Sequence, residues 1–268
     1  MGREKGKRWL GALAALAAIG LLLTSAGSRS MAVGSPAEDA RQQAVKAPRT
    51  VVVEDAPSIL EETAPELSGG LVAESEPVAV GYFDDAVFLG DSRTEGFYLY
   101  SGLRQGTYFY AVGATVASVF TKADWETPEG KIPLLDAVAQ ADCGKIYVML
   151  GVNELGWTKL EDFTGQYGKV IDRLREDHPE AQIVLESVLP VSARQDAKKS
   201  YVNNERIALY NEAIEALAEE KGCGYLNIAE AVAGSDGCLR ADWNYDGIHL
   251  NPAGCRAWLH YLETHSIS

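Results

Sequence analysis

The sequence predicts an α/β fold, a three-layer sandwich in which a mostly parallel five-stranded sheet is flanked by helices. From Tyr82 to Ser268, short apolar runs alternate with longer segments of helical periodicity. Repeated strand and helix units require parallel strands with helices on both faces of the sheet. Polar clusters directly follow three of the apolar runs, and open sheets of this kind bind ligands at the carboxyl ends of their strands. The architecture therefore predicts where the chemistry lies before any motif is considered.

The N-terminal 30 residues form the clearest targeting segment. Arg3, Lys5, Lys7 and Arg8 precede an alanine- and leucine-rich run, and no further charge occurs until Arg29. A basic start followed by an apolar stretch and small residues is typical of a signal peptide. The uncharged residues 9–28 are also about long enough to span a bilayer as an uncleaved anchor. Both alternatives predict export, with the product either secreted or anchored at the outer face of the cytoplasmic membrane.

Residues 31–80 predict a flexible acidic linker. They contain no aromatic residue, five of the 10 prolines, and nine acidic against three basic residues. Such a segment cannot bury enough apolar surface to offset the entropy lost on ordering. We therefore expect the folded domain to occupy residues 81–268.

Within that domain, the elements follow one another as strand and helix. The middle long helix shows the pattern best, because Ile207, Tyr210, Ile214 and Leu217 share one face at three- and four-residue spacing. Strands are expected at residues 86–89, 107–112, 145–150, 182–188 and 224–227, and the longest helices at residues 161–177, 201–221 and 252–265.

Charge and cysteine content restrict the class of partner. The formal net charge is −14, and since the first 30 residues carry +4, the remainder carries −18. Nucleic-acid binding needs a basic surface, so no nucleic-acid partner is expected. The four cysteines show no zinc-type spacing. In an exported chain they permit disulfides, and a bridge from Cys238 to Cys255 would close the loop between them, although free buried thiols remain an alternative for Cys143 and Cys223.

The apolar run before Gly90 ends in a tripeptide with a hydroxyl, Gly90-Asp91-Ser92. These residue types commonly make a turn and cap a helix, and that reading alone explains them. A serine at the end of a parallel strand also lies where such sheets bind ligands, and its N–H is free at the helix start. We expect Asp91 to brace the turn by a hydrogen bond.

A serine nucleophile needs a base and a group that orients the base. Of four histidines, only His249 lies in a loop rich in Gly, Asp and Asn, three residues after Asp246. That spacing allows the carboxylate to contact one imidazole nitrogen while the other points outward. Alone, the pair more often marks a turn.

Four blocks together carry a family resemblance. They are GDS at 90–92, the glycine at 113, GVNE at 151–154 and DGIH at 246–249. In this order and on this background, the domain from Ala86 to Leu262 resembles the SGNH hydrolases, also called the GDSL esterase/lipase family. The resemblance implies a flavodoxin-like sandwich and an esterase without cofactor or metal. It also implies a structural role for Asn211.

The resemblance implies a role for each matching position. Ser92 would be the nucleophile, His249 the general base and Asp246 the residue that orients it. The N–H groups of Ser92 and Gly113 and the side-chain amide of Asn153 would form the oxyanion hole. The third block of the family more usually reads G-x-N-D, so Glu154 is a departure.

The substrate is less defined by the sequence. Trp157 and Trp243 flank the site blocks, and either could form a wall against a sugar ring or an acyl group, although tryptophans more often pack in a core. An exported, tethered esterase favours a short O-acyl ester on a cell-envelope or environmental glycan. Acyl transfer to a glycan, lysophospholipid hydrolysis and a non-catalytic surface-binding role stay open. A metallophosphoesterase is disfavoured, because one loop histidine is too few for its ligand set.

Overall fold

The computed structural model describes residues 69–267. The predicted signal peptide or anchor and most of the predicted linker lie outside the described residues. No helix within 69–267 has the length and apolarity needed to cross a membrane.

One sheet forms the centre of the domain, and all of its strand pairs are parallel. Its spatial order is β1-β8-β7-β6-β2-β3. The strands are β1 (Gly70–Leu71), β2 (Ala86–Gly90), β3 (Thr107–Tyr110), β6 (Lys145–Met149), β7 (Gln182–Glu186) and β8 (Gly224–Leu226). The α/β class and all five predicted strands are confirmed, and β1 is a sixth strand.

Strand β1 lies inside the range predicted as linker. Gly70 donates its N–H to the Cys223 carbonyl at 2.9 Å, and Gly70 and Leu71 pair in register with Gly224 and Tyr225. Farther along, the N–H of Val78 donates to the Glu263 carbonyl at 2.8 Å, at the end of the last helix. The folded domain therefore begins by Gly70, and the boundary predicted at residue 81 was placed too far along the chain. Backbone hydrogen bonds and two half-buried valines, Val72 and Val78, hold this segment. So few apolar contacts left little sign of order in its composition.

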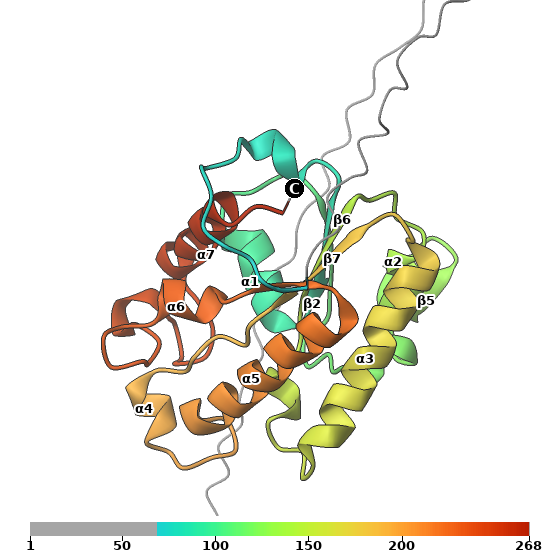
Figure 1. Cartoon of the computed structure of the whole chain (residues 1–268). Coiled ribbons are helices and arrows are strands. Elements are labelled where there is room, and N and C mark those ends of the chain that lie inside the picture. Colours follow the sequence, from blue (N-terminus) through green and yellow to red (C-terminus); the bar gives the residue numbers. More distant parts are fainter. Residues whose placement is uncertain (1–68, 268) are drawn as a thin grey trace, which may run out of the picture. The chain divides into compact units, whose positions relative to one another are not determined.

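Helices cover both faces of the sheet (Figure 1). On one face, α2, α3 and α5 lie over a core that contains Val87, Leu89, Ile146 and Val148. On the other face, α1, α6 and α7 lie over Phe88, Tyr147 and Met149, among others. Successive strand residues thus point to opposite cores, which explains why the buried strands read as continuous apolar runs. The helices are α1 (Ser92–Tyr100), α2 (Leu134–Val138), α3 (Leu160–Asp177), α4 (Ala193–Asp196), α5 (Asn204–Lys221), α6 (Ile228–Val232) and α7 (Pro252–Thr264).

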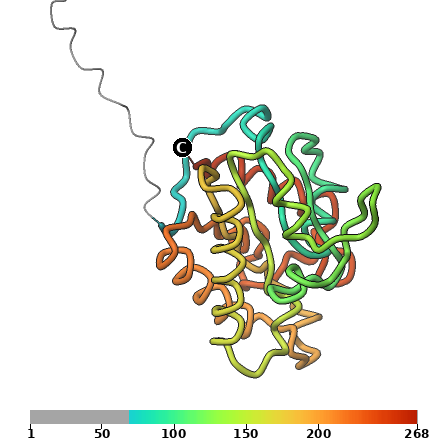
Figure 2. The backbone as a smooth tube through the Cα atoms, turned by 90° about the vertical axis from the view of Figure 1, so that its right-hand side faces the viewer, coloured from blue at the N-terminus to red at the C-terminus, as the bar shows by residue number. Residues whose placement is uncertain are grey.

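The two longest helices, α3 and α5, lie side by side in both views (Figure 2). Asn211, on α5, binds the backbone of Val188 just beyond β7 twice, by accepting from its N–H at 2.8 Å and donating to its carbonyl at 2.9 Å. This bidentate contact fits the structural role that the family resemblance implied for Asn211.

A hairpin between β3 and α2 was not predicted. It consists of β4 (Ala123–Thr127) and β5 (Gly130–Pro133), which pair antiparallel. Trp125 of β4 packs edge-on against Phe109 of β3, with ring centroids 5.0 Å apart. The hairpin lacks a regular apolar alternation, and two half-buried side chains, Trp125 and Ile132, attach it to the core.

All four cysteines are free thiols. Cys255 is buried in α7, where its Sγ approaches the Gly96 carbonyl of α1 at 3.5 Å. Cys238 instead accepts from the Asn204 side chain at 3.4 Å. The predicted bridge between Cys238 and Cys255 is therefore absent, because the two thiols pack against different neighbours.

Candidate active site

Ser92 lies at the junction of β2 and α1. At Gly90 the chain passes so close to β6 that an added Cβ would lie 2.7 Å from the Met149 carbonyl oxygen, so only glycine fits. Asp91 is the N-cap of α1, and its Oδ1 accepts from the Arg93 N–H at 2.8 Å. The predicted bracing role of Asp91 is thus confirmed. Ser92 is the first residue of α1, so its N–H has no acceptor within the helix.

Ser92, His249 and Asp246 form a continuous hydrogen-bonded chain. The Ser92 Oγ lies 2.9 Å from His249 Nε2, and His249 Nδ1 lies 2.8 Å from Asp246 Oδ2. Residues 157 positions apart in sequence are thereby joined at one site. The sequence analysis predicted that these three residues share one site, and in the structure they are in hydrogen-bond contact.

The loop that carries Asp246 and His249 is fixed by its own backbone. The Asp246 Oδ1 accepts from the N–H groups of Ile248 and His249, both at 2.9 Å. Partial burial would raise the pKa of Asp246, but these bonds and the bond to the imidazole outweigh it and lower the pKa to about 2. Asp246 is therefore a carboxylate at neutral pH and favours the imidazole tautomer with its proton on Nδ1.

Gly113 and Asn153 follow the strands on either side of β2. Gly113 lies in a turn closed by the Ala114 N–H and the Ala111 carbonyl at 3.0 Å, and its φ of 78° lies in the left-handed region that favours glycine. Asn153 belongs to the short 3-10 helix η3 (Val152–Glu154) after β6. Its Nδ2 donates to the Ala114 carbonyl at 2.8 Å and contacts Asp91 Oδ2 at 3.4 Å. The sheet order thus sets Ser92 between these two residues at the carboxyl edge.

Ionisable side chains buried beside the serine were less evident from the sequence. Glu154 is fully buried, and burial raises its pKa to about 7. Burial also raises the pKa of Asp91. Arg93 is 3% exposed, donates from Nη1 to the Leu189 carbonyl at 3.0 Å, and has its pKa lowered by burial to about 10.

Arg93 was missed by the sequence reading, although one signal could have found it. A cation in the first turn of a helix opposes the positive end of the helix dipole. Its place directly after Ser92 therefore required a compensating partner. The Asp91 carboxylate supplies that compensation, because its charge raises the pKa of Arg93 against the effect of burial.

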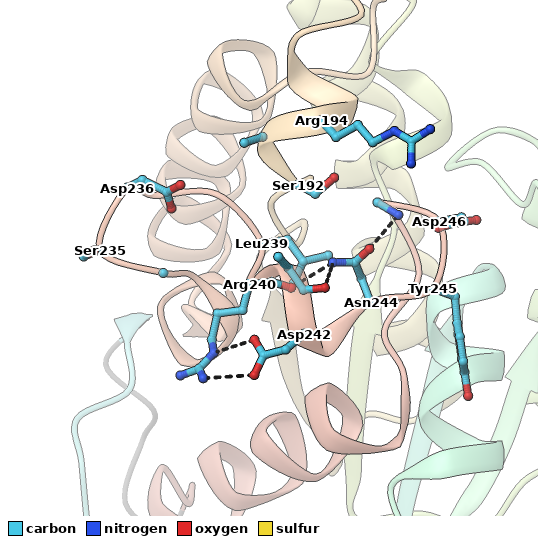
Figure 3. Close-up of a pocket in the computed structure, with 14 residues that line it drawn as sticks. Ser192, Arg194, Ser235, Asp236, Leu239, Arg240, Asp242, Asn244, Tyr245 and Asp246 are labelled. Atoms are coloured by element: carbon cyan, nitrogen blue, oxygen red, sulfur yellow. Dashed lines mark hydrogen bonds and ion pairs between the residues drawn. The ribbon is translucent and has the colours of Figure 1, made fainter.

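A cleft of about 590 Å³ lies beside the Asp246 loop (Figure 3). Its lining is mostly polar or charged and includes Ser192, Arg194, Asp236, Arg240, Asp242, Asn244, Tyr245 and Asp246. In its wall, the Asn244 side chain accepts from the Gly247 N–H at 2.8 Å and so connects the cleft to the loop that carries the histidine. Ser92 and His249 are not among the lining residues, so the cleft adjoins the hydrogen-bonded chain at Asp246.

The two candidate tryptophans do not line this cleft. Trp243 has the Arg240 guanidinium over its ring, 3.9 Å from the centroid. Trp157 is partly buried against the core of the α3 face and lines a separate surface depression with Ala117 and Glu161. One face of the Trp243 ring is therefore occupied by a cation, and a substrate role for either tryptophan stays a prediction.

No cluster of three or more His, Cys, Asp or Glu side chains suited to a metal ion occurs within residues 69–267. The hydrogen-bonded chain itself is built from groups that transfer protons and acyl groups.

Comparison with known proteins identifies the family. The sequence profile of the GDSL-like Lipase/Acylhydrolase family matches residues 88–257. A search of curated proteins finds no match. Among solved structures, a candidate platelet activating factor from Streptococcus pneumonia is 23% identical with a TM-score of 0.56, over 70% of this chain and 82% of that chain. A candidate GDSL-like lipase from Parabacteroides merdae is 15% identical with a TM-score of 0.53, over 71% of this chain and 95% of that chain.

These structural similarities show that the fold is shared, whereas the family assignment rests on the profile match, which covers more than half of the chain. The four sequence blocks, the parallel sheet and the serine, histidine and aspartate at its carboxyl edge agree with that match. The chain belongs to the GDSL-like Lipase/Acylhydrolase family and is a carboxylic ester hydrolase.

Proposed function

We propose that this protein is an exported serine esterase that removes short, acetyl-like O-acyl groups from a glycan of the cell envelope or the environment. The observation that carries the catalytic part is the hydrogen-bonded chain from Ser92 through His249 to Asp246, at 2.9 and 2.8 Å.

The reaction proceeds through an acyl-serine intermediate. The Ser92 Oγ attacks the acyl carbon while His249 Nε2 takes the hydroxyl proton, and the carbonyl oxygen becomes an oxyanion. Collapse of this tetrahedral species breaks the ester bond, and His249 gives the proton to the departing alcohol. Water then repeats the sequence on the acyl-serine, which releases the carboxylic acid and restores the hydroxyl. Asp246, held ionised, orients the imidazole and stabilises its charged form throughout.

Three donors are assigned to the oxyanion: the N–H groups of Ser92 and Gly113 and the Nδ2 of Asn153. Among residues 69–267 no acceptor pairs with the Gly113 N–H. For Asn153, the contact with Asp91 at 3.4 Å is much longer than the bond to Ala114 at 2.8 Å. The Asn153 N–H that contacts Asp91 is therefore the more weakly bound of the two, and it is the one assigned to the oxyanion of the substrate.

The polar lining of the cleft favours a hydrated alcohol as the leaving group. Arg194 and Tyr245 present donors and an aromatic surface around a volume of about 590 Å³ next to Asp246 (Figure 3). A sugar carries hydroxyls that such groups bind, whereas a fatty chain prefers an apolar pocket. The export part of the proposal rests on the basic and apolar character of residues 1–30.

The proposal is tested by incubating the purified full-length chain with an activated acetate ester in the presence of a metal chelator. We expect turnover to persist, and mass spectrometry of rapidly acid-quenched protein to find one acetyl group on Ser92. Release of acetate from acetylated glycans, but not of fatty acid from a lysophospholipid, would support the substrate class. Turnover abolished by the chelator, or an acetyl group on another residue, would contradict the mechanism.

Asn153→Ala is expected to lower kcat by about 10²- to 10³-fold with little change in KM, because the amide stabilises charge that develops only in the transition state. Steady-state kinetics on the same ester measures both constants. Arg194→Ala is the control, because Arg194 lines the cleft and, within the described part of the chain, its side chain makes no bond to the loop that carries His249. It should affect KM for a glycan ester more than kcat. A loss of affinity alone in Asn153→Ala would show that Asn153 contacts the ground state instead.

A further inference from the structure

We propose that Glu154 is a positioning residue, which fixes the Gly113 loop against the Asn153 turn and thereby sets the geometry of the oxyanion donors. The inference rests on the proposed function, because it concerns the same site.

Two hydrogen bonds of opposite direction join the turn after β6 to the loop after β3. Asn153 donates its side-chain N–H to the Ala114 carbonyl at 2.8 Å. The next residue, Glu154, accepts the Val116 N–H on its Oε1 at 2.6 Å. These bonds bind the loop just beyond Gly113 at two points. The position of the Gly113 N–H relative to Ser92 therefore depends on both of them.

The backbone of Glu154 is fixed by two further hydrogen bonds. Its own backbone carbonyl accepts the Tyr210 hydroxyl of α5 at 2.6 Å and the Trp157 N–H at 2.7 Å. The residue is fully buried, and its Oε2 has no hydrogen-bond partner among the described residues. A buried carboxyl with one unpaired oxygen is unfavourable for stability, because desolvation of that oxygen is uncompensated. The hydrogen bond from the Val116 N–H to Oε1 gives the buried carboxyl a role, because it holds the loop in place.

The length of the side chain matters for this contact. Glu154 stands where the family more usually has aspartate, and the extra methylene carries its carboxyl farther from the backbone. A shorter side chain cannot meet the Val116 N–H at the same distance unless the loop moves. The length of the Glu154 side chain is thus expected to fit the position of the loop from Ala114 to Val116.

The chain supplies a matched control in Glu186, the last residue of β7. Its carboxyl is also buried, 2% exposed, and its Oε1 accepts one N–H, from Trp258 Nε1 at 3.0 Å. It contacts neither oxyanion loop. Methionine in place of either glutamate keeps a similar volume but removes the acceptor, and glutamine keeps the acceptor without charge.

The experiment compares Glu154→Met, Glu154→Gln, Glu186→Met and Glu186→Gln by kcat, KM and thermal stability, with active serines counted by a fluorophosphonate. Glu154→Met is expected to lower kcat per active serine by at least about 10-fold, because displaced donors stabilise the oxyanion less. KM should stay unchanged within about twofold, since ground-state binding is not affected. Glu154→Gln should recover most of the kcat, and Glu186→Met should lower the melting temperature without this loss. If Glu154→Met does not fold, Glu154→Asp replaces it, with a smaller loss of kcat expected.

A wild-type kcat in Glu154→Met, or an equal loss of kcat in Glu186→Met, would overturn the proposal. Amide hydrogen exchange at Val116 gives a readout independent of turnover. We expect faster exchange at Val116 in Glu154→Met, with exchange in β7 unchanged, and unaltered protection of Val116 would overturn the proposal. If wild-type protein hydrolyses no ester, the proposed function fails, and the exchange rate at Val116 alone decides the role of Glu154.

Discussion

Ser92→Ala is expected to lower kcat for an activated acetate ester by on the order of 10⁶-fold, because no other group at the site can form the acyl intermediate. Some activity above the uncatalysed rate should remain, since the proposed oxyanion donors are retained. Steady-state kinetics at high enzyme concentration, with protein from an expression host that lacks other esterases, measures the residual rate.

The control for this prediction is Ser101→Ala, at the other end of the same helix. Ser101 is buried and its hydroxyl accepts from the Leu103 N–H at 3.2 Å, so its loss affects packing but not the site. We expect Ser101→Ala to retain kcat while lowering stability by about 1 kcal/mol. Turnover that survives Ser92→Ala would identify a different nucleophile.

Glu186→Gln is expected to stabilise the protein at alkaline pH and to have little effect at acid pH. Burial raises the pKa of Glu186 to about 8, so the native state holds this proton more tightly than the unfolded chain does. Below the ordinary glutamate pKa both states are protonated and the group has no effect. As the pH rises toward 8, the unfolded chain loses the proton first and stability falls. Above that pH the full penalty, on the order of a few kcal/mol, is present.

Glutamine stays neutral at every pH and keeps an acceptor for the Trp258 N–H. The difference in melting temperature between Glu186→Gln and wild type should therefore be small at pH 5 and grow to several degrees at pH 9. Thermal unfolding followed by circular dichroism at pH 5, 7 and 9 measures this difference. A shift of the same size at all three values would show that Glu186 does not titrate in this range.

The parts of the fold that the sequence predicted are those whose stability comes from regular side-chain burial. Strand β2 shows this, because all five of its residues are buried and form one apolar run. Helix α5 has its buried residues at helical spacing, as the pattern predicted, although the helix begins at Asn204 rather than at residue 201.

Features held by backbone hydrogen bonds or by single contacts were not predictable in this way. Strand β1 has only two residues, too few to show any alternation. The β4–β5 hairpin is attached to the core by only two half-buried side chains, Trp125 and Ile132. The predicted bridge from Cys238 to Cys255 was wrong because spacing along the chain does not determine the distance between thiols.

The same distinction holds within the site. Ser92, Asp246 and His249 could be proposed together because each follows a strand or precedes a helix in a fixed order along the chain. The contact from Glu154 to Val116 depends on the conformation of two loops, and the burial of Arg93 depends on where the loop after β7 passes. Neither conformation is encoded in a short motif.

The position of β1 also protects one edge of the sheet. Without β1, strand β8 would be the outermost strand and would present unpaired N–H and C=O groups, which recruit strands from other molecules. Two residues suffice to pair with Gly224 and Tyr225, yet they are too few to serve as a template for a further strand. A chain cut at residue 82 would thus lose its protection against edge-to-edge aggregation while keeping every residue of the hydrogen-bonded chain at Ser92.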